Sequence, residues 1–381
     1  MASALLNGRM LLADGFAAGR AVLVEGERIA AILPEAEIPA GARRIDLDGA
    51  MLAPGFIDVQ VNGGGGALFN DAPTVETIAT IGAAHRRFGT TGFLPTLISD
   101  DLSVVREAVR AVDAAIEAGV PGVLGIHIEG PYLNSSRKGI HDSSKIRELD
   151  DAGFETITGL RHGRTLVTLA PERTTPAMIR RLVAAGLIVS AGHTNGRYED
   201  IRAALDAGVT GFTHLFNAMS PLTSREPGAV GAALEDPESW CGLIVDGRHI
   251  SPVTMRLALR CKPLDRFMLV TDAMPSVGMA EKSFRLQGQE IRVEDGVCVT
   301  ADGTLAGSDL DMAGAVRNAV AMLGLDAEAA LRMASAHPAR FLRLDGELGA
   351  IAPGMRASMV ALNEDFAVVR SWIDGIEAVS S

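Results

Sequence analysis

Histidine and acidic side chains follow several short apolar runs of the chain, and their types suit metal-assisted hydrolysis. His127, His193, His214 and His249 each lie in or just beyond such a run. We expect His193 and His214 to converge with Glu129 on one cation, because two imidazoles and a carboxylate bind catalytic zinc and leave a position for water. The alternative for any lone histidine is a purely hydrogen-bonding role. His127 shares a strand face with Glu129 and is expected to support a ligand rather than to bind the metal.

Asp272 follows the last of these apolar runs and is the candidate general base and acid. A carboxylate that faces a metal-bound water can accept its proton and later donate that proton to a leaving amine. The alternative for Asp272 is an N-cap of the next segment. His249 is expected to contact the substrate or its carbonyl group, and its alternative is a histidine of a surface loop.

These residues act together only if a fold brings several strand ends to one place. Eight apolar stretches predict buried strands, at residues 55–61, 92–97, 123–128, 166–169, 187–191, 211–215, 241–245 and 267–270. Amphipathic helices are predicted between most of them, for example at 74–88, 102–118, 176–185 and 198–207. Strands that alternate with helices pair in parallel, and eight of them can close, so the chain predicts an α/β fold with a (β/α)₈ TIM-like barrel. A doubly wound open sheet is the alternative.

The two ends of the chain have a different pattern, in which short strands are separated by turns. Neither end could bury a strand face alone, so residues 1–53 and 349–381 are expected to combine into one small β-sandwich domain. The catalytic barrel is then expected at residues 54–348. Three short apolar stretches within it predict a β-hairpin insertion near 284–300, before a helix from Leu310.

Composition limits the class of protein. The 381 residues are 48% hydrophobic and include 42 glycines, which argues against a coiled coil or helical bundle. A net charge of −12 argues against a nucleic-acid partner but allows a small phosphorylated ligand. No apolar run approaches the length of a membrane span. Three scattered cysteines and the absence of a signal-peptide pattern favour a cytoplasmic protein.

Five short segments carry a resemblance to a known family. They are PGFID at 54–58, GIHIEGPY at 125–132, GHTN at 192–195, THLFNAM at 213–219 and TDA at 271–273. Together they resemble the N-acetylglucosamine-6-phosphate deacetylase family, a branch of the amidohydrolase superfamily. The resemblance implies an amidohydrolase-type barrel that hydrolyses the acetamide of N-acetylglucosamine 6-phosphate to glucosamine 6-phosphate and acetate. It also implies that a metal-bound water is the nucleophile.

The resemblance carries roles to individual residues of this chain. It implies metal ligands at Glu129, His193 and His214, with the catalytic acid and base at Asp272. It implies contacts to the sugar and its phosphate from His141, His249, Asn217, the Ala218 backbone and Arg225. The last of these would reach across the interface of a homodimer.

The segment Gln60-Val61-Asn62 departs from the wider superfamily, in which many members have His-x-His and bind a second metal. Neutral amides bind zinc-like ions poorly, so Gln60 and Asn62 are expected near the metal water of a single-metal site. We expect one divalent ion per chain, zinc first, with iron, manganese or cobalt as alternatives. The alternative functions are deacetylation of the galacto epimer, hydrolysis by another type of amidohydrolase, and a non-catalytic scaffold on the same barrel.

Overall fold

A computed structural model describes residues 2–379, and its central feature is one sheet of eight parallel strands. The strands are β8 (Phe56–Val61), β11 (Thr90–Ile98), β12 (Gly125–Glu129), β13 (Arg164–Leu169), β14 (Ile188–Ala191), β15 (Gly211–Phe212), β16 (Trp240–Leu243) and β17 (Phe267–Leu269), neighbours in this order. Val61 forms a parallel bridge with Ala273, and the Asp272 N–H donates to the Gln60 carbonyl at 3.0 Å. These contacts join the last strand to the first. The predicted (β/α)₈ barrel is therefore confirmed, and the open sheet is wrong.

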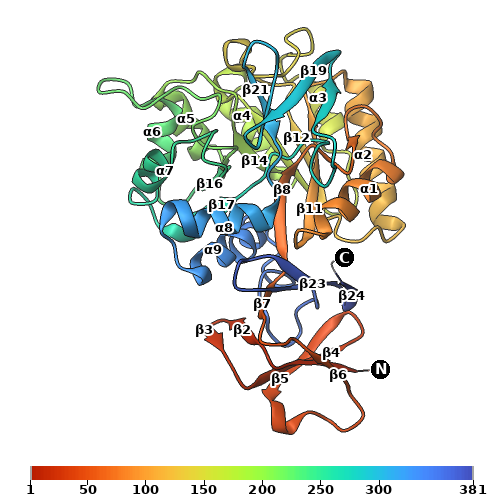
Figure 1. Ribbon diagram of the computed structural model, residues 1–381. Coiled ribbons are helices and arrows are strands. Elements are labelled where there is room, and N and C mark those ends of the chain that lie inside the picture. The colour runs from red at the N-terminus through yellow and green to blue at the C-terminus, as the bar shows by residue number, and fades with distance from the viewer. Residues whose placement is uncertain (1, 380–381) are drawn as a thin grey trace.

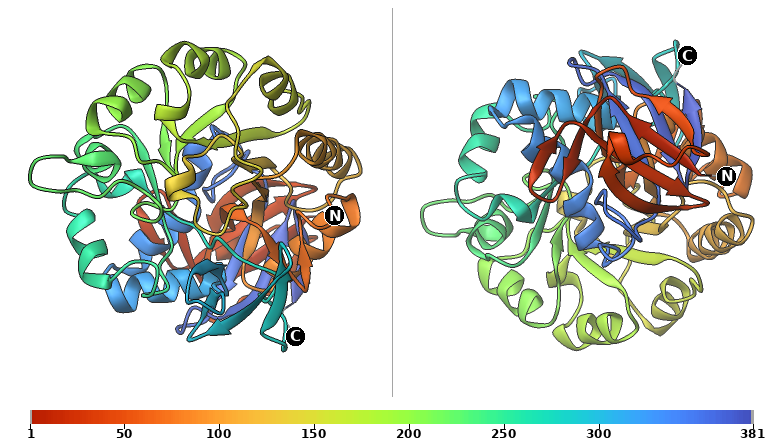
Figure 2. Two further views of the ribbon diagram at one scale, coloured as in Figure 1. Left: turned by 90° about the horizontal axis from the view of Figure 1, so that it is seen from above. Right: turned by 90° about the horizontal axis from the view of Figure 1, so that it is seen from below.

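Helices surround the strands in a ring, and the last helices of the chain lie under the lower end of the barrel, as Figures 1 and 2 show. The helices are α1 (Val75–Arg86), α2 (Leu102–Glu117), α3 (Asp151–Ile157), α4 (Pro176–Ala184), α5 (Tyr198–Asp206), α6 (Gly228–Glu235), α7 (Pro252–Ala258), α8 (Met312–Leu323), α9 (Ala327–Ala334) and α10 (Ala336–Phe341). Local sequence sets several of their ends: the Thr74 side chain caps α1, and Gly324 ends α8 in the left-handed conformation. Within residues 2–379, no helix is both long and apolar enough to cross a membrane.

The two ends of the chain form two sheets below the barrel (Figures 1 and 2). The first sheet contains β5 (Arg28–Pro34), β4 (Arg20–Glu25), β1 (Ser3–Leu6) and β6 (Arg43–Asp46). The second contains β24 (Ile376–Val379), β23 (Val368–Ile373), β22 (Met359–Leu362), β7 (Met51–Pro54), β2 (Arg9–Leu12) and β3 (Gly15–Ala17). Leu5, Met10, Met359 and Trp372 share one apolar core, which confirms a β sandwich built from both termini. The boundaries 1–53, 54–348 and 349–381 stay a prediction.

An inserted sheet lies at the opposite end of the barrel from the sandwich (Figure 1). It contains β18 (Ser283–Leu286), β19 (Gln289–Glu294), β20 (Val297–Val299) and β21 (Leu305–Ser308), all antiparallel. The insertion is thus larger than the hairpin expected near 284–300, because it is a sheet of four strands that extends to Ser308. The Met274 N–H donates to the Ser308 carbonyl at 3.0 Å, so the insertion is attached to the segment that follows β17.

Candidate active site

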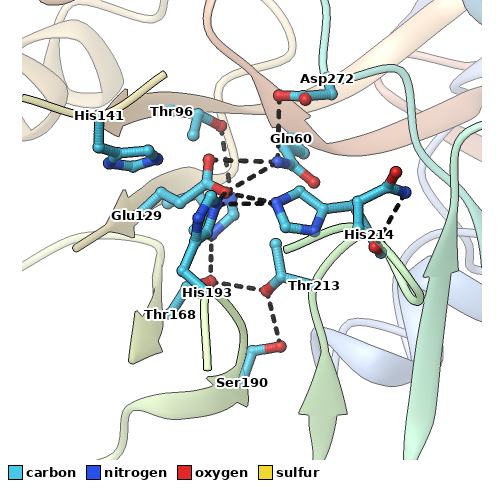
Figure 3. A network of polar contacts seen from close by, with 12 residues as sticks. Gln60, Thr96, Glu129, His141, Thr168, Ser190, His193, Thr213, His214 and Asp272 are labelled. Carbon is cyan, nitrogen blue, oxygen red and sulfur yellow. Dashed lines mark hydrogen bonds and ion pairs between the residues drawn. The ribbon is translucent and has the colours of Figure 1, made fainter. Parts of the chain in front are cut away.

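Three predicted ligands meet at the carboxyl ends of β12, β14 and β15 (Figure 3). Glu129 is the last residue of β12, and His193 and His214 each come two residues after their strand. The three residues are 2%, 5% and 4% exposed. Glu129 Oε1 lies 3.1 Å from His193 Nε2 and 3.0 Å from His214 Nε2, and the two nitrogens are 3.0 Å apart. Parallel strands therefore bring together residues that are 85 positions apart in the chain.

The donor atoms of this cluster suit a divalent cation. The Arg137 carbonyl lies 2.8 Å from His193 Nδ1 and can only accept, so Nδ1 carries the proton of the neutral ring. His193 Nε2 then presents a lone pair towards the Glu129 carboxylate, which also presents lone pairs. Such groups repel one another unless a cation or proton lies between them. Two imidazole nitrogens and one carboxylate oxygen match the ligands of catalytic zinc-type sites, so the Glu-His-His cluster fits a divalent metal ion.

Gln60 connects this cluster to the candidate base. Its Nε2 donates to both carboxylate oxygens of Glu129, at 3.2 and 3.1 Å, and to Asp272 Oδ1 at 3.1 Å. Burial acts to raise the pKa of Glu129, but the hydrogen bonds and charges of His193 and His214 lower it well below its usual value. The Gln60 amide therefore stabilises two neighbouring carboxylates and offers them donors rather than ligand atoms.

Asp272 lies beside the cluster with one carboxylate oxygen free. Oδ1 accepts from Asn62 Nδ2 at 2.6 Å and from Gln60, whereas no hydrogen bond from residues 2–379 reaches Oδ2. Burial and the negative charge of Glu129 raise the pKa of Asp272 to about 6. The N-cap alternative is wrong, because the next helix, α8, has Asp311 as its N-cap.

Backbone geometry singles out the same residues. His193, His214 and Asp272 have φ values of +47°, +35° and +54°, in the left-handed region that non-glycine residues rarely adopt. Each such residue costs about 1–3 kcal/mol and persists where its surroundings hold it. All three follow a barrel strand, and this conformation helps to direct their side chains to one point.

A cavity of about 390 Å³ opens above these residues. It is lined by the three clustered residues, by Asp272 and Asn62, and by four of the predicted substrate contacts: His141, Asn217, Ala218 and His249. Arg225 does not line it and lies on an exposed loop of the same chain. A single chain therefore brings together every predicted site residue except Arg225. Gln60 does not line the cavity, but it donates to Glu129 and Asp272, which do.

The two further histidines of the cavity are held by different partners. The Ser99 N–H donates to His141 Nδ1 at 3.2 Å, which leaves the proton of the neutral ring on Nε2. Burial lowers the pKa of His141 well below its usual value. His249 Nδ1 lies 2.5 Å from Asp246 Oδ2, and both side chains are about 5% exposed or less. The surface-loop alternative for His249 is therefore wrong.

His127 lies outside the ligand cluster, as expected. Its Nε2 is 2.7 Å from Thr168 Oγ1, and Thr168 continues a chain of hydroxyl groups through Thr213 to Ser190 (Figure 3). Burial lowers the pKa of His127 to about 4, so the ring is neutral at pH 7. His127, Thr213 and Ser190 line a small internal cavity together with Gln60 and the candidate ligand His214.

Glu172 is a supporting residue that the sequence reasoning missed. Its carboxylate accepts from Thr194 Oγ1 at 2.5 Å, from the Asn195 N–H at 2.7 Å and from Asn134 Nδ2 at 2.9 Å. It thus joins the loop after His193 to the loop after β12. An acidic residue three positions beyond the fourth strand was the available signal, since His193, His214 and Asp272 also follow barrel strands closely.

Asp58 is a second missed residue, and it joins β8 to the end of β17. Its Oδ2 accepts from Thr271 Oγ1 at 2.5 Å, and Oδ1 accepts from the backbone N–H groups of Gln60 and Thr271 at 3.1 and 3.3 Å. Burial raises the pKa of Asp58 to about 7. The contact holds Thr271, the residue immediately before Asp272. The PGFID motif that contains Asp58 indicates by itself only the start of the barrel.

The inserted sheet also contributes to the cavity, which the sequence did not predict. Thr304, Leu305 and Gly307, in or beside β21, line the wall of the cavity. A Cβ atom at Gly307, where φ is +75°, would lie 2.9 Å from the Asp272 carbonyl, so only glycine allows this approach.

The chain is similar to known deacetylases over most of its length. Residues 51–376 match the model described as Amidohydrolase family, and residues 3–52 match the one described as NagA composite domain. An N-acetylgalactosamine-6-phosphate deacetylase of Shewanella sp. (strain ANA-3) is 45% identical over 340 residues, 89% of this chain and 86% of the relative. An N-acetylglucosamine-6-phosphate deacetylase of Haemophilus influenzae is 37% identical over 358 residues, 93% of each chain. The crystal structure of N-acetylglucosamine-6-phosphate deacetylase from Pasteurella multocida has a TM-score of 0.96 at 35% identity and covers 100% of both chains.

Proposed function

The chain belongs to the amidohydrolase family, and from this premise we propose that it hydrolyses N-acetylglucosamine 6-phosphate to glucosamine 6-phosphate and acetate. This membership confirms the resemblance that the five sequence segments carry. The observation that carries the proposal is the convergence of Glu129, His193 and His214 beside Asp272 on one cavity. A cytoplasmic location, which the scattered cysteines favour, belongs to the same proposal.

Glu129, His193 and His214 would hold one divalent ion per chain, which we assign as zinc, with iron, manganese and cobalt as alternatives. When bound, such an ion polarises a carbonyl group and lowers the pKa of a coordinated water. Gln60 and Asn62 favour a single ion, because their amide nitrogens already donate to carboxylates.

Asp272 moves the proton in the proposed reaction. Hydrogen bonds from Gln60 and Asn62 hold Oδ1, so Oδ2 is free to accept a proton from the attacking water. The oxygen of that water bonds to the acetyl carbon. As the C–N bond breaks, Oδ2 returns the proton to the nitrogen, and the products are acetate and the free amino sugar.

His249 and His141 would orient the acetylated sugar. The Asp246 carboxylate accepts from His249 Nδ1 and fixes the ring at the cavity wall, where it would lie beside the amide oxygen as negative charge develops there. His141 carries its proton on Nε2 and can donate it to a sugar hydroxyl. Both roles depend on carboxylate or backbone partners that fix the ring nitrogens.

The phosphate of the substrate would lie at the turn formed by Asn217 and Ala218. The Ala218 backbone is left-handed, with φ at +51°, and the turn lines the cavity beyond His214. Arg225 follows on an exposed loop and would reach the cavity of a second copy in a homodimer. A guanidinium suits this role because it donates two parallel hydrogen bonds to a phosphate.

An acetate-release assay tests the function and its alternatives. N-acetylglucosamine 6-phosphate and N-acetylgalactosamine 6-phosphate are each compared with their unphosphorylated forms, using chelated and metal-restored enzyme. We expect metal-dependent release and the higher kcat/KM for the phosphorylated gluco sugar. The Shewanella relative, named for the galacto substrate, motivates the second sugar. Faster turnover of that epimer would reassign the substrate, and no acetate from any sugar would favour another amidohydrolase or a non-catalytic scaffold.

A further inference from the structure

One cationic side chain of the cavity has no role in the proposed reaction. Arg137 ends a short 3₁₀ helix (Ser135–Arg137) after β12, and in the described chain it is the only lysine or arginine that lines the cavity. Glu129 and Asp272 line the same cavity, and the whole chain carries a net charge of −12. The chain as a whole therefore repels a phosphorylated substrate, and a cation beside the phosphate would offset part of that repulsion.

Hydrogen bonds hold Arg137 in place but leave its outer nitrogens free. Nε donates to Asn195 Oδ1 at 2.9 Å, and no carboxylate of residues 2–379 forms an ion pair with the guanidinium. The backbone carbonyl of Arg137 accepts from His193 Nδ1. Glu172 also joins the two loops on which Arg137 and Asn195 lie. The guanidinium is thus positioned by a hydrogen bond to Asn195, and no carboxylate of residues 2–379 competes with a bound phosphate for it.

This support brings Arg137 towards the expected phosphate position. Thr194, which precedes Asn195, donates its backbone N–H to the Ala218 carbonyl at 3.1 Å. The loop that anchors the guanidinium therefore runs beside the turn of Asn217 and Ala218. The two Nη groups can donate in parallel to a phosphate that lies against this turn.

We propose that Arg137 binds the 6-phosphate of the substrate within its own chain. This inference rests on the proposed function and adds a cation that does not depend on a second subunit. Arg225 differs in both respects, because it is exposed and lies outside the cavity of its own chain. The side chain of Arg137 contacts the substrate, while its backbone carbonyl orients His193, so a side-chain substitution separates the two roles.

Steady-state acetate release tests the proposal with phosphorylated and unphosphorylated N-acetylglucosamine. Arg137→Gln is expected to raise KM for the phosphorylated sugar about 10- to 100-fold, the loss typical of hydrogen bonds to a charged group. Its kcat/KM for the unphosphorylated sugar should change by less than about threefold, and Arg137→Lys should recover part of the loss. Arg248→Gln is the matched control, because Arg248 pairs with Asp295 at 2.6 Å and does not line the cavity.

An equal loss with both sugars would overturn the proposal, since it would indicate an effect on His193 rather than on phosphate. An unchanged KM for the phosphorylated sugar would overturn it as well. Calorimetric titration with inorganic phosphate is the second measurement, and Arg137→Gln should bind it at least about tenfold more weakly than the wild type. If the wild type releases no acetate, the deacetylase function fails, while the titration still decides the role of Arg137. Equal phosphate binding by wild type and variant, or none by either, would count against it.

Discussion

The floor and the rim of the cavity are built in different ways. At the floor, Glu129, His193 and His214 end or directly follow barrel strands, are buried and lie within 3.1 Å of one another. At the rim, Arg137 and Asn217 come from loops and are only half-buried. Strands hold the reacting groups in a fixed geometry, whereas loops can vary the recognised substrate without disturbing that geometry.

The largest effect is expected at the floor, from Asp272→Asn. The amide still accepts a hydrogen bond but cannot take a proton, so kcat should fall about 10²- to 10⁴-fold. Metal content should stay at the wild-type value, because Asp272 lies outside the ligand cluster. Steady-state kinetics and elemental analysis check both points, and a kcat within about threefold of wild type would remove Asp272 from its role.

Metal affinity should show the next largest effect. We expect about one divalent ion per wild-type chain by elemental analysis. His214→Asn should weaken binding by more than about a hundredfold, because even residues that only orient ligands contribute about 10- to 100-fold. His162→Asn is the control, since His162 is exposed and remote from the cavity. A reproducible two ions per chain would contradict the interpretation of Gln60 and Asn62.

Glu172 tests whether floor and rim are independent, because it supports both His193 and the loop of Arg137. Glu172→Gln keeps one acceptor oxygen for the Asn195 N–H but loses the charge and the second acceptor, which binds the Thr194 hydroxyl, so metal affinity should fall and KM should rise, each about tenfold. Chelator competition and acetate release measure the two effects, with exposed Glu148→Gln as the control. A change in KM alone would show that the floor is held without this contact.

Asp58 lies beneath the floor and should affect stability in a pH-dependent way. Its pKa rises to about 7 in the folded chain, above the value of about 3.9 in unfolded chains, so the folded state binds the proton more tightly. That contribution to stability is present below pH 4 and is lost as the pH rises through 7. Between pH 5 and 8 the wild type should lose about 2–3 kcal/mol of unfolding free energy relative to Asp58→Asn.

Urea unfolding of the metal-free chains at the two pH values measures this difference. Asp151→Asn, at an exposed position, serves as the control for the loss of a carboxylate. If the gap between wild type and Asp58→Asn is the same at pH 5 and pH 8, Asp58 does not titrate in this range. The contact would then act only through its hydrogen bonds to Thr271.

Much of the fold was predictable because the signals are local. Eight apolar stretches predicted the eight barrel strands, and the helices expected at 74–88 and 198–207 correspond to α1 and α5 within two residues at each end. The inserted sheet was predicted in part only. Its fourth strand, β21, ends in Gly307 and Ser308, two residues that do not favour a strand. Pairing with β20 stabilises the extended backbone there.

The rim was less predictable than the floor for a physical reason. Floor residues follow strands, and in a parallel barrel all strand ends of one kind meet at one edge. Rim residues such as Leu305 and Arg137 reach the cavity through loops whose paths depend on distant contacts. The contact of Asp246 with His249 was not predicted for the same reason, because it depends on how the loop between them folds.

The sequence by itself determined the residue types that do chemistry, their positions after apolar strands and the number of strands. The predicted convergence of Glu129, His193 and His214 depends on barrel closure, because the three residues lie far apart in the chain. Only the tertiary structure decided which loop residues join them, such as Arg137 and Leu305. It also decided the orientation of both histidines and of Asp272, through left-handed backbone at all three residues. That conformation is unfavourable locally, so only contacts between distant segments can maintain it.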